Sequence, residues 1–192
     1  MLVISCHADT CRRSHDCEVR GNAFYGHLDN FVGVHAVMLA YFSGRLHHDF
    51  VRIELTYGEE TDSEGARQVL ATLRKRDTVI VVDVTGTPTT RDFVIEKCKD
   101  PAMTSFLTKA LKRFRFDLYE DCPDPVANED EVDVYVEKIP RTFFLGVPVF
   151  GGDYNREKVS VRRRSVQAVA GALCAIADAY PAFCKSHGLR AD

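Results

Sequence analysis

Residues 77–84 read DTVIVVDV, a nearly continuous apolar run with one acidic residue close to its end. A strand that is buried on both faces of a parallel sheet has this composition, because helices cover both of its faces. Asp83 is the exception in the run, since an isolated ionised carboxylate is costly to bury in apolar surroundings. The stretch therefore predicts an α/β fold and marks Asp83 as a candidate functional residue.

Strand and helix patterns alternate in both directions from this run. Residues 2–5 and 50–57 have strand character, and further strands are predicted at 93–97 and 142–147. Apolar residues recur at helical spacing in 31–42, around 66–73, in 101–114 and in 161–180. The predicted class is α/β, a three-layer sandwich with a mostly parallel mixed sheet and helices on both faces. The acidic stretch 120–131, with two prolines, is predicted to be a surface loop.

Composition narrows the class of protein. The chain has 192 residues, of which 45% are hydrophobic and 28% charged, and a net charge of −3. We expect one catalytic-type domain over residues 1–192, without a lid or dimerisation domain, and neither nucleic-acid nor membrane binding. The seven cysteines form no CxxC pair, and the first residues have no basic leader, so we expect reduced thiols and a cytoplasmic protein.

Polar residues gather where the predicted strands end. His7 and Asp9 follow the first strand, Glu59 and Glu60 follow the second, and Asp83 ends the third. In parallel sheets ligands bind at this edge, and converging carboxylates repel one another unless a cation lies among them. One imidazole with several carboxylates suits zinc, manganese or cobalt, so the pattern predicts a metal site.

Other roles for these residues stay open at this level. Glu59 and Glu60 would also suit the start of a helix, where acidic residues favour the helix dipole. An α/β protein whose acids are only caps and surface charges would explain this pair, but it explains Asp83 poorly. Asp9, two residues after His7, could accept the second ring N–H of His7 and orient the ring.

Four motifs carry a family resemblance: HAD at 7–9, GHLDNFVGVHA at 26–36, TYGEETDSEGA at 56–66 and VVDVTG at 81–86. Their order resembles the zinc-dependent exopeptidase superfamily of co-catalytic aminopeptidases and carboxypeptidase-like deacylases. The resemblance implies that His7, Asp29 and Asp83 hold one metal ion. It also implies that Asp29 bridges to a second ion bound by Glu60, that Glu59 is the general base, and that the peptide bond after Asp29 is cis.

The chain departs from the family pattern near its end. Residues 151–160 read GGDYNREKVS, and Asn155 stands where the family has a histidine ligand. A neutral carbonyl is a weak zinc ligand, so the second ion would bind weakly, need help from Asp153, or be missing. The chain also looks like a short, lidless member that lacks the leading helix and strand common in the family.

Two functions therefore remain in competition. One is a metal-dependent exopeptidase or amide deacylase that hydrolyses small peptides or N-acyl amino acids, with one or two zinc ions and Glu59 as base. The other is a degenerate relative that keeps the fold, and at most one metal, as a binding or structural protein. An oligomer is possible in either case.

Overall fold

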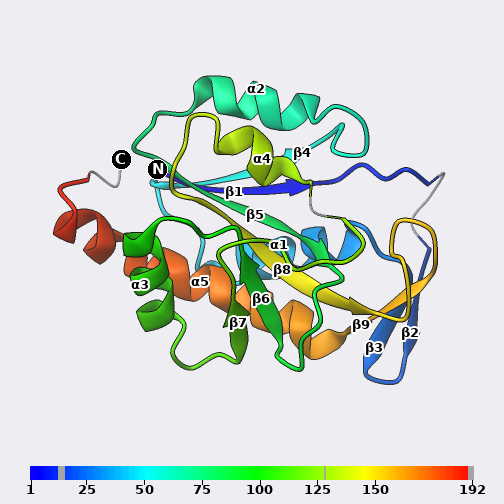
Figure 1. Cartoon of the computed structure of the whole chain (residues 1–192). Coiled ribbons are helices and arrows are strands. Elements are labelled where there is room, and N and C mark those ends of the chain that lie inside the picture. The colour runs from blue at the N-terminus through cyan, green and yellow to red at the C-terminus, as the bar shows by residue number, and fades with distance from the viewer. Residues whose placement is uncertain (13–15, 128, 190–192) are drawn as a thin grey trace.

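Four parallel strands form the centre of the sheet, in the order β8-β5-β1-β4 (Figure 1). They are β1 (Leu2–His7), β4 (Val51–Thr56), β5 (Thr78–Thr85) and β8 (Thr142–Phe150). Every residue of β1 and β5 is buried, as the apolar run at 77–84 predicts. The structure is a computed structural model and describes residues 1–12, 16–127 and 129–189.

Antiparallel strands extend the sheet beyond β8. Strand β9 (Val159–Arg162) pairs with the end of β8, and the hairpin of β2 (Asp16–Arg20) and β3 (Ala23–His27) continues from β9. Strand β6 (Phe93–Glu96) pairs antiparallel with β8 and carries β7 (Phe116–Leu118) in parallel. The sheet is therefore mixed, with strand β4 at one edge and strand β2 at the other.

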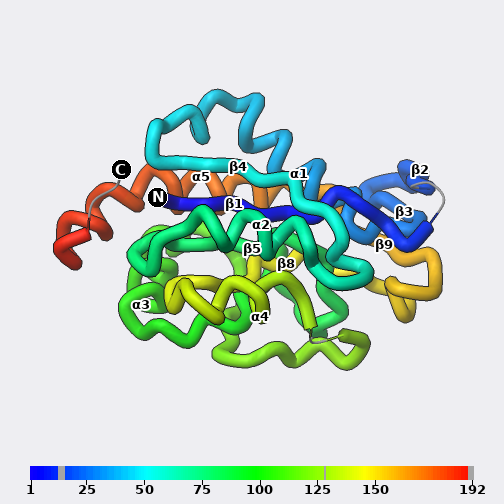
Figure 2. Tube along the Cα trace, turned by 90° about the horizontal axis from the view of Figure 1, so that it is seen from above, coloured from blue at the N-terminus to red at the C-terminus, as the bar shows by residue number. Residues whose placement is uncertain are grey.

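Helices cover both faces of this sheet. Helices α1 (Phe31–Phe42) and α5 (Arg163–Ser186) pack together on one face, with α3 (Pro101–Ala110) against α5. Helices α2 (Glu64–Thr72) and α4 (Glu131–Tyr135) pack together on the other face, as Figure 2 shows from above. Each face has its own apolar core, so the predicted three-layer α/β architecture is confirmed.

Helix α5 is the one described helix whose length and hydropathy would suit a membrane span. Its most apolar window is 56% buried within the fold, and it packs on α1, β8 and β9. A buried core helix of a globular domain accounts for both properties.

Several local predictions were wrong. The β2–β3 hairpin, β7 and α4 were not predicted, because the hairpin and β7 strands are only partly buried and α4 spans five residues. Val161 belongs to β9 rather than to the last helix, which begins at Arg163. The stretch 120–131 is not wholly a surface loop, since Glu131 is 1% exposed and begins α4 under the cap of Asp130.

Candidate metal centre

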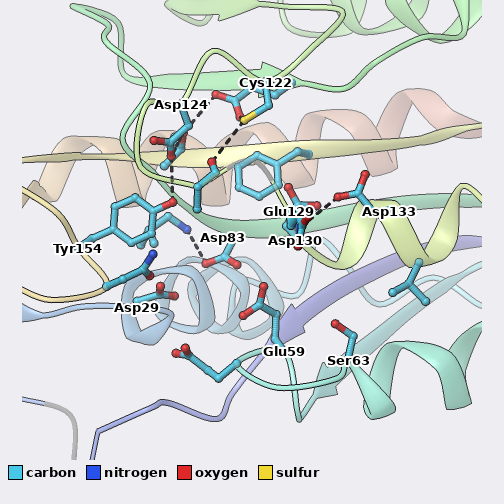
Figure 3. Close-up of a pocket in the computed structure, with 18 of the residues that line it drawn as sticks. Asp29, Glu59, Ser63, Asp83, Cys122, Asp124, Glu129, Asp130, Asp133 and Tyr154 are labelled. Carbon is cyan, nitrogen blue, oxygen red and sulfur yellow. Dashed lines mark hydrogen bonds between the residues drawn. The ribbon is translucent and has the colours of Figure 1, made fainter.

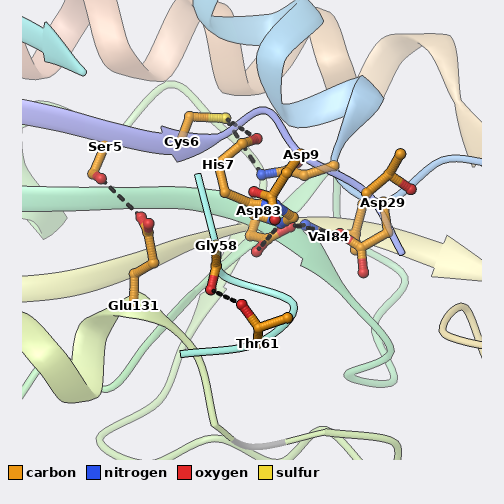
Figure 4. A network of polar contacts seen from close by, with 12 residues as sticks. Ser5, Cys6, His7, Asp9, Asp29, Gly58, Thr61, Asp83, Val84 and Glu131 are labelled. Carbon is orange, nitrogen blue, oxygen red and sulfur yellow. Dashed lines mark hydrogen bonds and ion pairs between the residues drawn. The ribbon is translucent and has the colours of Figure 1, made fainter. Parts of the chain in front are cut away.

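Three predicted ligands meet at the carboxyl edge of the sheet. His7 ends β1, Asp83 lies near the end of the neighbouring strand β5, and Asp29 lies in the turn before α1. His7 Nε2 lies 3.1 Å from Asp83 Oδ2 and 3.2 Å from Asp29 Oδ1. The three side chains converge in Figure 4, and each offers one ligand atom within 4.8 Å of the others. This His7-Asp29-Asp83 cluster could hold a metal ion.

The residue after Asp29 fixes the position of the turn. The peptide bond from Asp29 to Asn30 is cis, as the resemblance implies. Asn30 Nδ2 donates to the carbonyl oxygen of Val82 at 2.8 Å, which ties the start of α1 to the strand that carries Asp83. A Cβ at Gly33 would lie 1.9 Å from Asn30 Oδ1, so only glycine permits this close approach. Asp29 and Asp83 are therefore held together through one buried amide.

The electrostatics of the cluster call for a cation. Burial disfavours the charged ring of His7, but Asp83 and Asp29 outweigh it and raise the pKa of His7 above its ordinary value. Burial also raises the pKa of Asp83, with His7 opposing the shift. Placing two carboxylates around one buried ring is unfavourable without a compensating positive charge, which a protonated imidazole or a metal ion would supply.

The geometry of the contacts around His7 distinguishes a metal site from an ordinary hydrogen-bonded ion pair. Both ring nitrogens of His7 and Asp29 Oδ1 are buried and lie 3.1 to 3.4 Å from the atoms they face in ion pairs, but within the described part of the chain none of these contacts has hydrogen-bond geometry. Such buried atoms normally have partners, so their geometry fits ligation better than hydrogen bonding. Asp9 Oδ1 lies 3.4 Å from His7 Nδ1, on the side away from Asp83, where a carboxylate would orient a ligating ring.

Glu59 and Glu60 lie in the turn between β4 and α2. Helix α2 begins only at Glu64, so neither residue is in its first turn and the helix-dipole explanation does not apply to them. Burial raises the pKa of Glu59 to about 7; His7 opposes the shift, and Asp29 and Glu60 add to it. Burial and Asp29 also raise the pKa of Glu60. Both side chains line the pocket that contains Asp29 and Asp83.

This pocket has a volume of about 740 Å³ and a strongly acidic lining. Figure 3 shows Asp29, Glu59 and Asp83 grouped in it. Its described lining residues include Arg67 as the one basic side chain and ten acidic ones, namely Asp29, Glu59, Glu60, Asp62, Asp83, Glu96, Asp124, Glu129, Asp130 and Asp133. A molecule that enters it meets a negative potential.

Sequence reasoning missed one wall of the pocket. Asp124 accepts hydrogen bonds from Tyr154 Oη at 2.9 Å and from the backbone N–H of Gly86 at 2.6 Å. Glu96 is 1% exposed and accepts from Cys122 Sγ at 3.3 Å. For Asp124 the signal in the sequence was the acidic stretch 120–131, which was predicted to be a surface loop.

Asn155 also lines this pocket, but the structure does not bring it into the ligand cluster. Asn155 is exposed. Its backbone N–H donates to Asp153 Oδ1, and its backbone carbonyl oxygen accepts from Arg12 Nη2 at 2.6 Å. Within the described residues, the only group of ligand-type histidine, cysteine and acidic side chains close enough for one ion is His7, Asp29 and Asp83. Glu60 and Asn155 thus stay predictions for a second ion.

Solved structures share this fold. An aminopeptidase from the archaeon Desulfurococcus kamchatkensis is 17% identical with a TM-score of 0.71, and 90% of this chain covers 54% of that one. Yeast aminopeptidase 1 is 10% identical with a TM-score of 0.67, and 92% of this chain covers 51% of it. PhTET1-12s, solved as a dodecamer, is 13% identical with a TM-score of 0.68, and 86% of this chain covers 53% of that one. The fold is that of these aminopeptidases.

The likeness is confined to the fold. No protein-family model matches the chain, and no curated protein sequence matches it. The chain spans about half the length of these aminopeptidases. Fold alone does not establish activity, so function has to be argued from the site.

Proposed function

We propose that the chain is a metal-dependent aminopeptidase whose first metal ion is held by His7, Asp29 and Asp83. The observation that carries the proposal is the buried meeting of these three side chains, with ring and carboxylate atoms that have no hydrogen-bond partner among the described residues. A mixed nitrogen and oxygen ligand set suits zinc, with manganese and cobalt as alternatives.

Glu59 would act as the general base. A bound zinc ion supplies a Lewis acid that polarises the scissile carbonyl and acidifies water. Glu59 would accept the proton of the attacking water and then donate it to the leaving amine nitrogen. Its partly buried position beside Asp29 holds its pKa at about 7, which is near the optimum for proton transfer at neutral pH. Asp9 would keep the ring of His7 oriented.

The charge of the pocket favours a peptide with a free amino terminus over an N-acyl amino acid. A peptide brings an ammonium group into the acidic lining, whereas an N-acyl amino acid brings a carboxylate and no cation. Aminopeptidase activity is therefore the better fit of the two hydrolytic reactions, and amide deacylation is the weaker one.

A non-catalytic, single-metal relative is the second candidate. The exposed residue Asn155 and the absence of a second ligand cluster within the described residues favour it. Glu60 lines the pocket beside Glu59 and would hold a second ion only with weak help from the Asn155 amide or from Asp153.

Metal content and activity together separate the candidates. We expect at least one zinc ion per chain by elemental analysis and hydrolysis of aminoacyl p-nitroanilides, faster for lysyl than for glutamyl substrate. Glu59→Gln should keep the metal and lose at least about 100-fold in kcat. Glu64→Gln, an exposed change at the start of α2, is the matched control and should keep full activity.

Zinc binding without hydrolysis of any such substrate would favour the binding protein. Full activity of Glu59→Gln would refute the assigned base. Absence of bound zinc under zinc-replete conditions would refute the site itself.

A further inference from the structure

Strand β4 has an unpaired outer edge. It lies at the end of the sheet and pairs only with β1 in the part of the chain that the structure describes. Unlike the fully buried β1 and β5, β4 has four half-buried residues followed by Leu55, which is 48% exposed. An open edge of this kind offers backbone donors and acceptors to another strand.

The ladder with β1 determines which backbone groups point outward. The N–H of Leu2 donates to the carbonyl oxygen of Phe50 at 2.8 Å, and Leu2 is in register with Val51. Even-numbered residues of β4 therefore point their backbone groups toward β1. Because successive residues of a strand alternate, Ile53 and Leu55 point both N–H and C=O toward the open side. Ile53 lies in the middle of this free edge.

The charges on β4 are self-complementary about Ile53. Arg52 and Glu54 flank it on one face of the strand and form an ion pair with each other. If two copies of β4 pair antiparallel with Ile53 opposite Ile53, each Arg52 faces Glu54 of the other copy. The neighbouring registers that preserve the hydrogen-bonding pattern place Arg52 opposite Arg52, or Glu54 opposite Glu54, and such like-charge pairs are destabilising.

The other face of β4 is apolar. Val51 and Ile53 pack against the core on the α1 side of the sheet, and Leu55 continues their row. In the pairing centred on Ile53, Leu55 of one copy lies opposite Val51 of the other. Leu55 is 48% exposed, so this pairing would cover an apolar side chain that the free edge leaves in contact with solvent.

We propose that the chain forms a twofold symmetric dimer through antiparallel pairing of β4 with β4 of a second copy, centred on Ile53. The two sheets then join into one continuous sheet, and the twofold axis places Arg52 of each copy opposite Glu54 of the other. A twofold interface requires a self-complementary patch, and the sequence Arg52-Ile53-Glu54 provides one. The proposal is independent of catalytic activity.

Charge reversal tests the pairing by analytical ultracentrifugation. The wild-type chain should be a dimer at micromolar concentration. Arg52→Glu and Glu54→Arg should each raise the dimer dissociation constant by about 10- to 100-fold, because two attractive pairs become repulsive. An equimolar mixture of the two variants should form a heterodimer, since each variant then meets opposite charge. If the variants weakened the dimer only through loss of the ion pair between Arg52 and Glu54 of one chain, mixing them would not restore it.

The opposite edge of the sheet provides the matched control. Strand β2 carries a similar pair, Glu18 and Arg20, around the exposed Val19. Arg20→Glu should leave the dimer unchanged. A monomeric wild type, failure of the two β4 variants to pair when mixed, or dissociation by Arg20→Glu would each overturn the proposed interface.

Discussion

If His7, Asp29 and Asp83 bind zinc as proposed, loss of one carboxylate from this cluster should abolish stabilisation by zinc. His7, Asp29 and Asp83 come from three separate segments, and only the folded chain brings their ligand atoms within 4.8 Å of one another. Zinc bound there stabilises the folded state alone, and the stabilisation grows with the concentration of free zinc. At 100 times the dissociation constant it reaches about 2.7 kcal/mol.

This free energy sets the expected change in the melting temperature, Tm. For a domain of 192 residues, about 1 kcal/mol shifts Tm by roughly 2–4 °C, so zinc should raise the Tm of the wild-type chain by roughly 5–10 °C. Asp83→Asn replaces a charged ligand by a neutral amide. The variant should show a shift below about 2 °C at the same zinc concentration.

Differential scanning calorimetry with and without zinc measures both shifts. Asp178→Asn is the control, because Asp178 is half-exposed on α5 and pairs with Arg45 away from the pocket. Binding of zinc to the unfolded chain affects all three proteins alike. A full shift in Asp83→Asn, or no shift in the wild type, would refute the assignment of His7, Asp29 and Asp83 as ligands.

Two further predictions concern the framework of the site. Gly65→Ala should lower the free energy of unfolding by about 2 kcal/mol in urea denaturation, because the new Cβ would lie 2.5 Å from the backbone nitrogen of Tyr57. At a helix position with open space, a change from glycine to alanine would instead raise the free energy of unfolding by up to about 1 kcal/mol. The direction of the change therefore tests the predicted clash. Gln68→Ala on the same helix is the control. Glu131→Gln should raise the free energy of unfolding at pH 8, because burial raises the pKa of Glu131 and the ionised carboxylate is disfavoured in the folded state. The folded state of the wild type binds the Glu131 proton more tightly than the unfolded state does. The difference in the free energy of unfolding between variant and wild type should therefore vanish as the pH falls to about 4.5. A difference that stays unchanged between pH 8 and this pH would contradict the prediction.

The sequence alone predicted the regular elements whose burial pattern is strong. The run at 77–84 became β5, and the helical spacing at 31–42 matches α1. Parallel strands place their carboxyl ends at one edge, so the positions of His7 and Asp83 at that edge followed from local pattern. The β2–β3 hairpin escaped prediction, because its short, partly exposed strands have no apolar alternation of that strength.

Only the tertiary structure decided how the polar residues are used. The distances among His7, Asp29 and Asp83 depend on the packing of a strand, a neighbouring strand and a turn, and no local pattern contains them. Glu131 resembles the exposed acids Glu129 and Asp133 in sequence, yet α4 packs over the sheet and buries it beside Ser5. Sequence periodicity reports which face of an element is apolar, whereas the burial of a single charged group depends on what packs over it.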